Sequence, residues 1–107
     1  MISNLPLSEQ YRVAADLWVD ADAAATILEE LKTATLNQRM LALGEMAVNR
    51  AEMLVKGSAE WRQYIENMVA ARTKANKLKV RMEELRMRYG ETQSEEASRR
   101  AELRMTA

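Results

Sequence analysis

The sequence predicts an all-α protein, a helical hairpin or bundle with one long C-terminal helix of coiled-coil character. Its 107 residues contain only three Gly and one Pro, whereas an all-β chain needs many more turn residues. Apolar residues make up 48% of the chain, too high a share for a disordered one. From Ser58 to Tyr89 there is no Gly or Pro, and apolar residues recur at heptad spacing. The length suits a single helical domain over residues 1–107.

The N-terminal half is expected to begin with an extended arm over residues 1–7, because Pro6 disfavours helical angles in the residue before it. A helical segment over residues 8–43 follows, with Ser8 as its candidate N-cap. Two aspartates inside this segment are able to cap a second start, so the sequence leaves open whether it forms one long helix or two. Its apolar stripe is expected to comprise Ala24, Ile27, Leu28 and Leu31, continued by Leu36, Met40 and Leu43.

A turn and a short helix are expected over residues 44–57. Gly44 stands where a left-handed C-terminal cap favours glycine. Residues 49–52, Asn-Arg-Ala-Glu, have the form of a capping box, which would start the short helix at Asn49. Gly57 is expected to break that helix, and Ser58 is the candidate N-cap of the next one.

The long helix is expected over residues 58–104. Heptads that start at Trp61 give an apolar seam, which has one set of core positions and a second set three residues later. The first set is Trp61, Met68, Ala75, Met82 and Tyr89, and the second is Tyr64, Ala71, Leu78 and Leu85. Beyond Gly90 the seam fades, so this end is expected to fray or to depend on a partner, with support from the pairs Glu95–Arg99 and Glu96–Arg100.

Charge is distributed unevenly, although 16 Lys and Arg balance 16 Asp and Glu. Residues 8–36 carry six acidic and two basic side chains, a net charge of −4, whereas residues 72–88 carry seven basic and two acidic ones, a net charge of +5. The cations nearest the seam are Arg72, Lys79 and Arg86 on one side and Lys74, Arg81 and Arg88 on the other. These side chains are expected to bind acidic residues of the N-terminal helices, nucleic-acid phosphates or an acidic protein partner.

Composition excludes several kinds of chemistry. A chain without His or Cys has no Ser-His or Cys-His nucleophile and no zinc site of the usual type. Three scattered glycines do not make a phosphate-binding loop. We therefore expect no enzyme, no cofactor and no catalytic or metal-binding residue, while a magnesium site made only of carboxylates stays open. No apolar run approaches the roughly 20 residues of a membrane span, and the N-terminus has no signal-peptide pattern, so an intracellular protein without membrane contact is expected.

The length of the predicted long helix favours self-association. Forty-odd residues at 1.5 Å each span on the order of 70 Å, which is more than the N-terminal helices can cover. A homo-oligomer, with a dimer favoured, would bury the remainder of the seam. Parallel pairing would bring the cationic flanks of two copies together, so an antiparallel arrangement is expected.

Two runs of the sequence, LWVDADAAATILEELK and NRAEMLVKGSAEWRQYIENMVAARTKANKLKVRMEELRMRY, resemble small helical proteins encoded by tailed bacteriophages and prophages. The resemblance covers about residues 17–94. The genes of the resembled proteins lie among early phage genes for recombination and replication. It implies an accessory role in the cytoplasm of a bacterial host and supplies no catalytic residue.

Three functions are consistent with these expectations. The leading hypothesis is a non-enzymatic, oligomeric helical interaction module that binds another protein, acting in phage DNA recombination or replication. The alternative is a nucleic-acid-binding accessory protein that uses the basic flanks of the long helix. A second alternative is a virion or assembly component.

Overall fold

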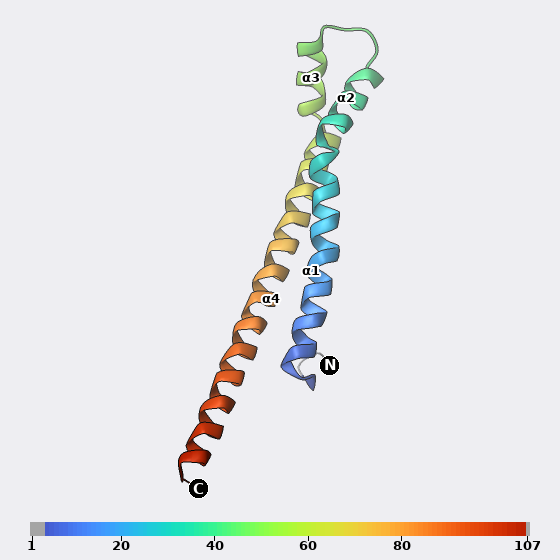
Figure 1. Ribbon diagram of the computed structural model, residues 1–107. Helices are drawn as coiled ribbons and strands as arrows, with labels where there is room; N and C mark the ends of the chain where they lie inside the picture. The colour runs from blue at the N-terminus through green and yellow to red at the C-terminus, as the bar shows by residue number, and fades with distance from the viewer. Residues whose placement is uncertain (1–3, 107) are drawn as a thin grey trace. The chain divides into compact units, whose positions relative to one another are not determined.

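The computed structural model describes residues 4–106, and every regular element within them is an α-helix (Figure 1). Helix α1 spans Leu7–Glu30, α2 spans Lys32–Ala42, α3 spans Val48–Lys56 and α4 spans Ala59–Thr106. The predicted all-α class and the long C-terminal helix are thereby confirmed. Of the arm expected over residues 1–7, the first three residues lie outside the described part, and α1 already begins at Leu7.

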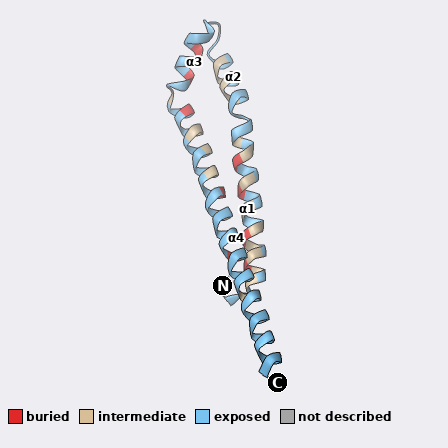
Figure 2. Ribbon diagram, turned by 60° about the vertical axis from the view of Figure 1, so that its left-hand side comes forward, coloured by how far each residue is buried: buried red, intermediate tan, exposed pale blue. Residues whose placement is uncertain are grey.

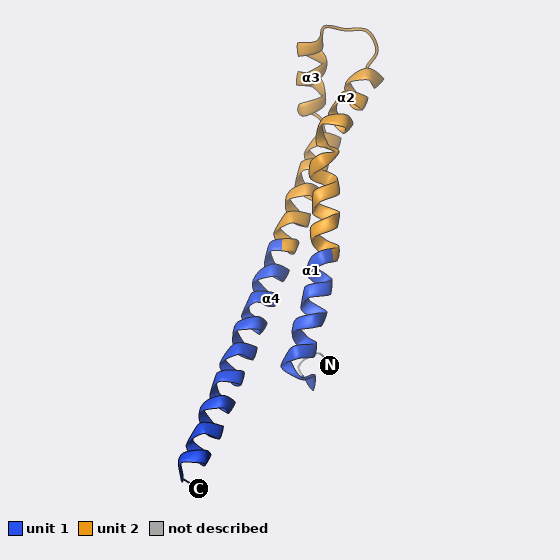
Figure 3. Ribbon diagram, in the orientation of Figure 1, with its two compact units in different colours: residues 1–19, 76–107 blue, residues 20–75 orange. Residues whose placement is uncertain are grey.

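The chain divides into two compact units (Figure 3). Unit 1 consists of residues 1–19 and 76–107, and unit 2 consists of residues 20–75. Helices α1 and α4 therefore each contribute a segment to both units, whereas α2 and α3 belong to unit 2 alone.

Unit 2 is a helical hairpin built from one continuous stretch of chain. Tyr64 of α4 donates its hydroxyl hydrogen to the carbonyl of Leu28, and Arg72, further along α4, binds Asp22 and Glu29 of α1. Tyr64 reaches Leu28, whereas Arg72, two turns later in α4, reaches back to Asp22 and Thr26, so the two segments are antiparallel. The buried apolar residues of this unit are Ala21, Ala25, Ala51, Val55, Trp61 and Ala75.

Unit 1 pairs the first part of α1 with the segment of α4 that begins at Asn76. The Lys79 ammonium lies 5.9 Å from the ring centroid of Trp18, and Ser8 lines a groove together with Tyr89, so these segments are antiparallel too. Gln10 is buried, and its Nε2 donates to the carbonyl of Leu5 at 2.7 Å. The buried apolar residues of this unit are Ala14 and Leu85.

The apolar core is small. In the described part of the chain eight apolar residues are buried and five of them are alanines, while seventeen large apolar residues are exposed (Figure 2). Burial stabilises a protein by about 0.8 kcal/mol per CH₂ group, so alanines contribute little each. They do allow two helix backbones to approach closely, because interaxial distance depends on the side chains at the contact.

Burial along α4 recurs at the spacing of the predicted seam. Trp61, Ala75 and Leu85 are buried, and the seam positions Tyr64, Met68, Ala71, Leu78 and Met82 are partly buried. Outside the seam, Ile65, Arg72 and Thr92 are partly buried too. Tyr89 differs, since it is 42% exposed. Its ring lines an open groove opposite the first turn of α1 and does not belong to a closed core.

The apolar stripe predicted for the N-terminal half is wrong by part of a helical turn. Ile27 and Leu31 are more than half exposed and Ala24 is exposed, whereas Ala21 and Ala25 are buried. The prediction followed the largest apolar side chains, but the face of α1 that packs is the one with the smallest. The rest of the predicted stripe fares better, since Leu28, Leu36 and Met40 are partly buried, although Leu43 is exposed.

The question of one helix or two in the N-terminal half is resolved by Leu31. This single residue separates α1 from α2, and it keeps right-handed helical angles, with φ −83° and ψ −3°. Its N–H still donates to the carbonyl of Ile27, and its own carbonyl accepts from Thr35. The two predicted aspartate starts are not used.

Two of the predicted helix caps are also incorrect. Ser8 lies inside the first turn of α1, because the carbonyl of Pro6 accepts the N–H groups of Glu9 and Gln10, both at 3.0 Å. Helix α3 begins at Val48, and no side chain caps it. Glu52, the expected acidic member of a capping box, instead binds Lys56 one turn later at 2.7 Å.

Two other predicted caps are confirmed. Gly44 follows the C-terminal end of α2 with φ +90°, the left-handed conformation that glycine adopts without strain. Ser58 precedes α4, and its Oγ accepts the N–H of Trp61 at 3.2 Å while its hydroxyl donates to the carbonyl of Val55 at 2.6 Å. Ser58 thus ties the end of α3 to the start of α4.

Candidate docking groove and charged flanks

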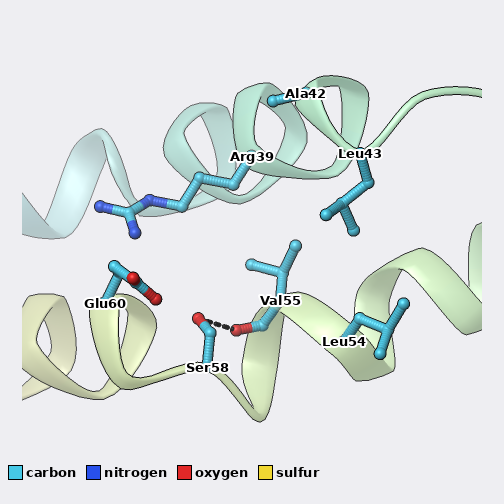
Figure 4. A pocket seen from close by; sticks show the side chains of 7 residues that line it. All are labelled: Arg39, Ala42, Leu43, Leu54, Val55, Ser58 and Glu60. Atoms are coloured by element: carbon cyan, nitrogen blue, oxygen red, sulfur yellow. Dashed lines mark hydrogen bonds between the residues drawn. The ribbon is translucent and has the colours of Figure 1, made fainter.

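The clearest candidate for a docking site is a groove in unit 2, which we call the tip groove. It encloses about 200 Å³ between the end of α2, the end of α3 and the start of α4. Its walls are Arg39, Ala42, Leu43, Leu54, Val55, Ser58 and Glu60 (Figure 4).

Local sequence signals build the tip groove. Gly44 ends α2 in a left-handed turn, after which three residues lead into α3. Gly57 and Ser58 then separate α3 from α4, so three helix ends meet here. Val55 is buried, and the side chains of Leu43 and Val55 extend into the space between α2 and α3 (Figure 4).

The tip groove has apolar walls and one charged end, where Arg39 and Glu60 face each other (Figure 4). Leu43 and Leu54 are about half exposed, so each has apolar surface left to cover. Neither Arg39 nor Glu60 forms an ion pair with any residue among 4–106. A volume of about 200 Å³ is below the usual 300–1,000 Å³ of small-molecule pockets and suits one large apolar side chain.

Of the six cations predicted beside the seam, Arg72 is engaged within the chain. Its Nη1 donates to Asp22 at 2.6 Å, while its Nε and Nη2 donate to the two carboxylate oxygens of Glu29 at 2.9 and 2.7 Å. A further bond joins its Nη2 to the Thr26 hydroxyl at 3.2 Å. Hydrogen bonds from Arg72 lower the pKa of the Glu29 carboxyl and, in return, raise the pKa of the guanidinium. These bonds leave Arg72 without a free pair of N–H groups that could bind an external phosphate at two oxygens.

The other five cations have different surroundings. Lys79 lies over Trp18, and Arg81 has Glu84 at 3.6 Å on its own helix. Lys74, Arg86 and Arg88 are exposed and form no ion pair with another described residue.

The C-terminal part of α4 departs from its predicted ion pairs. Glu95–Arg99 and Glu96–Arg100 form no salt bridge, and Arg100 donates instead to the backbone carbonyl of Glu96 at 3.4 Å. From Arg86 to Thr106 every residue except Thr92 is exposed. The predicted weakness at Gly90 does not interrupt the helix.

Sequence reasoning did not find the tip groove. Arg39 and Glu60 lie 21 positions apart, and neither belongs to a motif. The local signal was Gly44 followed by Gly57 and Ser58, which fixes where helices end. It does not reveal which side chains the three ends bring together.

Among residues 4–106 no three acidic side chains cluster closely enough to hold a metal ion. None of the described helices combines the length and the apolar character needed to cross a bilayer.

Comparison with known proteins does not place this chain in a family. Neither the protein-family models, nor the curated proteins, nor the solved structures give a match to this chain. Its class, the all-α proteins, is assigned from its own helices.

Proposed function

We propose that this chain is a non-enzymatic helical interaction module, and that it binds another protein at the tip groove. The observation that carries the proposal is the groove itself, which combines half-exposed leucines with two charges that have no partner among the described residues. Large exposed apolar residues outnumber buried ones in the described part of the chain, so apolar surface remains for a partner to cover.

The chemistry of the groove indicates the partner it fits. A helix that presents one Leu, Met or Phe would place this side chain between Leu43 and Leu54, as anchor residues do in interfaces. An acidic residue beside the anchor would pair with Arg39, and a basic one would pair with Glu60. Met53, which is 74% exposed on α3, adds an adaptable apolar contact at this end of unit 2.

Self-association is a second part of this proposal. A core in which alanines predominate leaves much of the stabilisation to be gained elsewhere, and a second copy is the simplest source of apolar surface. A dimer would also cover exposed residues along α4 that have no counterpart in α1.

The setting of the module rests on the phage resemblance of the sequence. A role in DNA recombination or replication in the cytoplasm of a bacterial host follows from that resemblance alone. It agrees with a small accessory protein, and it adds no residue to the site.

Photo-crosslinking in the source cells tests the docking. Benzoylphenylalanine in place of Leu54 should yield one adduct whose partner peptide is helical and apolar with a charged neighbour. Leu43→Asp in the same chain should abolish that adduct. The matched control carries the crosslinker at Leu103, which is 63% exposed on α4 and remote from the groove in sequence.

The outcomes separate the alternatives. Equal adducts from both positions, or none from Leu54, would overturn the tip groove as a docking site. An adduct between two copies of this chain would assign the groove to self-association and remove the external partner.

A further inference from the structure

A second and larger groove lies in unit 1, and we call it the tyrosine groove. It encloses about 460 Å³, and its walls are Ser8 and Tyr11 from α1 and Arg86 and Tyr89 from α4. Each pair is spaced three residues apart, so both side chains of a pair lie on one face of their helix. The antiparallel packing of unit 1 brings the two faces together.

The walls of the tyrosine groove are accessible and chemically unusual for this chain. Tyr89 is 42% exposed, Tyr11 is partly buried, and the remaining two are exposed. The sequence has only three tyrosines, and two of them meet here. Arg86 has no carboxylate partner among the described residues.

The same combination of an aromatic ring and a cation recurs one heptad away. Trp18 lies seven residues after Tyr11 on α1, and Lys79 lies seven residues before Arg86 on α4. The Lys79 ammonium lies 5.9 Å from the Trp18 ring centroid. Seven residues of helix rise about 10.5 Å, so unit 1 carries two such pairs in a row.

The acidic residues that occupy Arg72 in unit 2 have no equivalents in unit 1. Asp22 and Glu29 hold that guanidinium, but the α1 positions at heptad intervals before them are Ala15 and Ser8. Helix α4 continues its cations at these intervals with Lys79 and Arg86, whereas the unit 1 carboxylates of α1, Glu9 and Asp16, lie at other positions and bind Arg12. Lys79 and Arg86 form no ion pair with a described residue and are thus available to an external anion.

We propose that the tyrosine groove binds single-stranded nucleic acid. A base stacks on Tyr89 and Tyr11, a phosphate binds Arg86, and a neighbouring phosphate reaches Lys79. Stacking on an aromatic face requires an unpaired base, which selects single strands over duplexes. Two phenol rings and a guanidinium serve any base, so recognition is tolerant of sequence.

This inference concerns a different surface from the tip groove and is independent of the protein-docking proposal. The sequence alone does not reveal this groove, because Tyr11 and Tyr89 lie 78 positions apart. An acidic peptide would also bind Arg86. Its affinity would not depend on the Tyr11 and Tyr89 rings, and this difference distinguishes it from a nucleic acid.

The test is fluorescence anisotropy of the full chain with labelled (dT)20, with 20-base-pair DNA and with an acidic peptide at 50 mM salt. Tyr89→Ala should weaken (dT)20 binding about 5- to 150-fold, the effect of one stacked base, and Tyr89→Phe should restore it. Arg86→Gln should weaken binding and reduce the salt slope by about 0.7, the share of one single-strand phosphate.

The matched control is Arg50→Gln, which removes the same charge from α3 in the other unit. Circular dichroism checks that each variant keeps its helices. Absent binding at 50 mM salt, tighter binding of the duplex or the peptide, unchanged affinity in Tyr89→Ala, or an equal loss in Arg50→Gln would each overturn the proposal.

Discussion

At the scale of single residues, Arg72 shows that ion pairing between α1 and α4 was predictable from the sequence, whereas the identity of the paired residues was not. The opposed charges of the two halves indicated that acidic α1 side chains would meet cations of α4. Six cations flank the seam, and only the register of two antiparallel helices brings one of them to Asp22 and Glu29. The planar guanidinium then reaches both carboxylates at once, which a lysine ammonium does less well.

The lowered pKa of Glu29 predicts a pH-dependent contribution to stability. Its folded value is below the ordinary 4.5, so the stabilisation is fully present above pH 4.5 and is lost as pH falls through the folded value. Glu29→Gln should therefore be less stable than wild type at pH 7, and the difference should shrink toward pH 3. Urea unfolding at several pH values measures this, with Glu30→Gln as the matched control. A difference that grows in acid would contradict the assignment.

Tyr64 supplies a second residue-scale prediction. Its hydroxyl donates to the carbonyl of Leu28, close to where α1 ends. Tyr64→Phe keeps the ring, which stacks on Trp61 with centroids 5.4 Å apart, and removes the hydrogen bond. The free energy of unfolding should fall by about 1 kcal/mol. Tyr89→Phe is the control and should leave stability unchanged, and equal effects of the two changes would show that the bond contributes nothing.

At the scale of elements, local signals predicted two of the four helix caps, and periodicity predicted the buried face of α4 but missed that of α1. Gly44 and Ser58 were found because a left-handed turn and an N-cap depend on one residue and its immediate neighbours. The buried face of α1 was missed because Ala21 and Ala25 gain their role only from the helix packed against them. Ile27 and Leu31, which single-helix patterning favours, belong to a face that no described helix covers.

Two glycines in different conformations give a matched pair of predictions. Gly44 has φ +90°, so Gly44→Ala should destabilise unit 2 by about 1 kcal/mol or more through backbone strain. Gly90 is inside α4, and a methyl group there would meet nothing within 4 Å. Gly90→Ala should stabilise the helix by up to about 1 kcal/mol. Urea unfolding followed by circular dichroism measures both signs, and a stabilising Gly44→Ala would refute the left-handed turn.

The seam of α4 is tested by truncating one buried leucine. Leu85 is 1% exposed and is the largest fully buried side chain among the described residues. Leu85→Ala should lower the free energy of unfolding by about 2–5 kcal/mol. Leu103→Ala, on an exposed part of the same helix, should change it by less than about 0.5 kcal/mol. Similar losses at both positions would mean that α4 is covered along its whole length by something outside the described chain.

At the scale of the whole molecule, the imbalance between exposed and buried apolar residues was only partly foreseeable. Composition gave 48% apolar residues, enough for an ordinary core. The structure uses alanines for most buried positions and leaves the larger side chains outside. Sequence patterning shows which residues are apolar. It does not show which of two apolar faces of a helix packs against the neighbouring helix.

This imbalance predicts self-association. In sedimentation velocity the wild-type chain should show a dimer or larger species at micromolar concentration. The triple variant Lys74→Glu, Arg81→Glu and Arg88→Glu should assemble more weakly than wild type, while its Arg72 ion pairs stay intact. High salt should reduce this difference in assembly, because it screens the introduced charges. A wild-type monomer at these concentrations would refute the oligomer, and an undisturbed triple variant would refute a role for these cations in it.

The alanine face of the core also bears on the register of the two helices. Cations repeat every seven residues at Arg72, Lys79 and Arg86, so a slip of α4 by one heptad would still place an ammonium beside Asp22 and Glu29. The slipped register would keep an ion pair, although an ammonium reaches both carboxylates less well than a guanidinium. Packing opposes the slip more strongly, because it would move Met82 into the place of Ala75, which has no exposed surface, and three more heavy atoms would have to enter the core there. Side-chain volume at one alanine therefore selects the alignment, and the charges follow it.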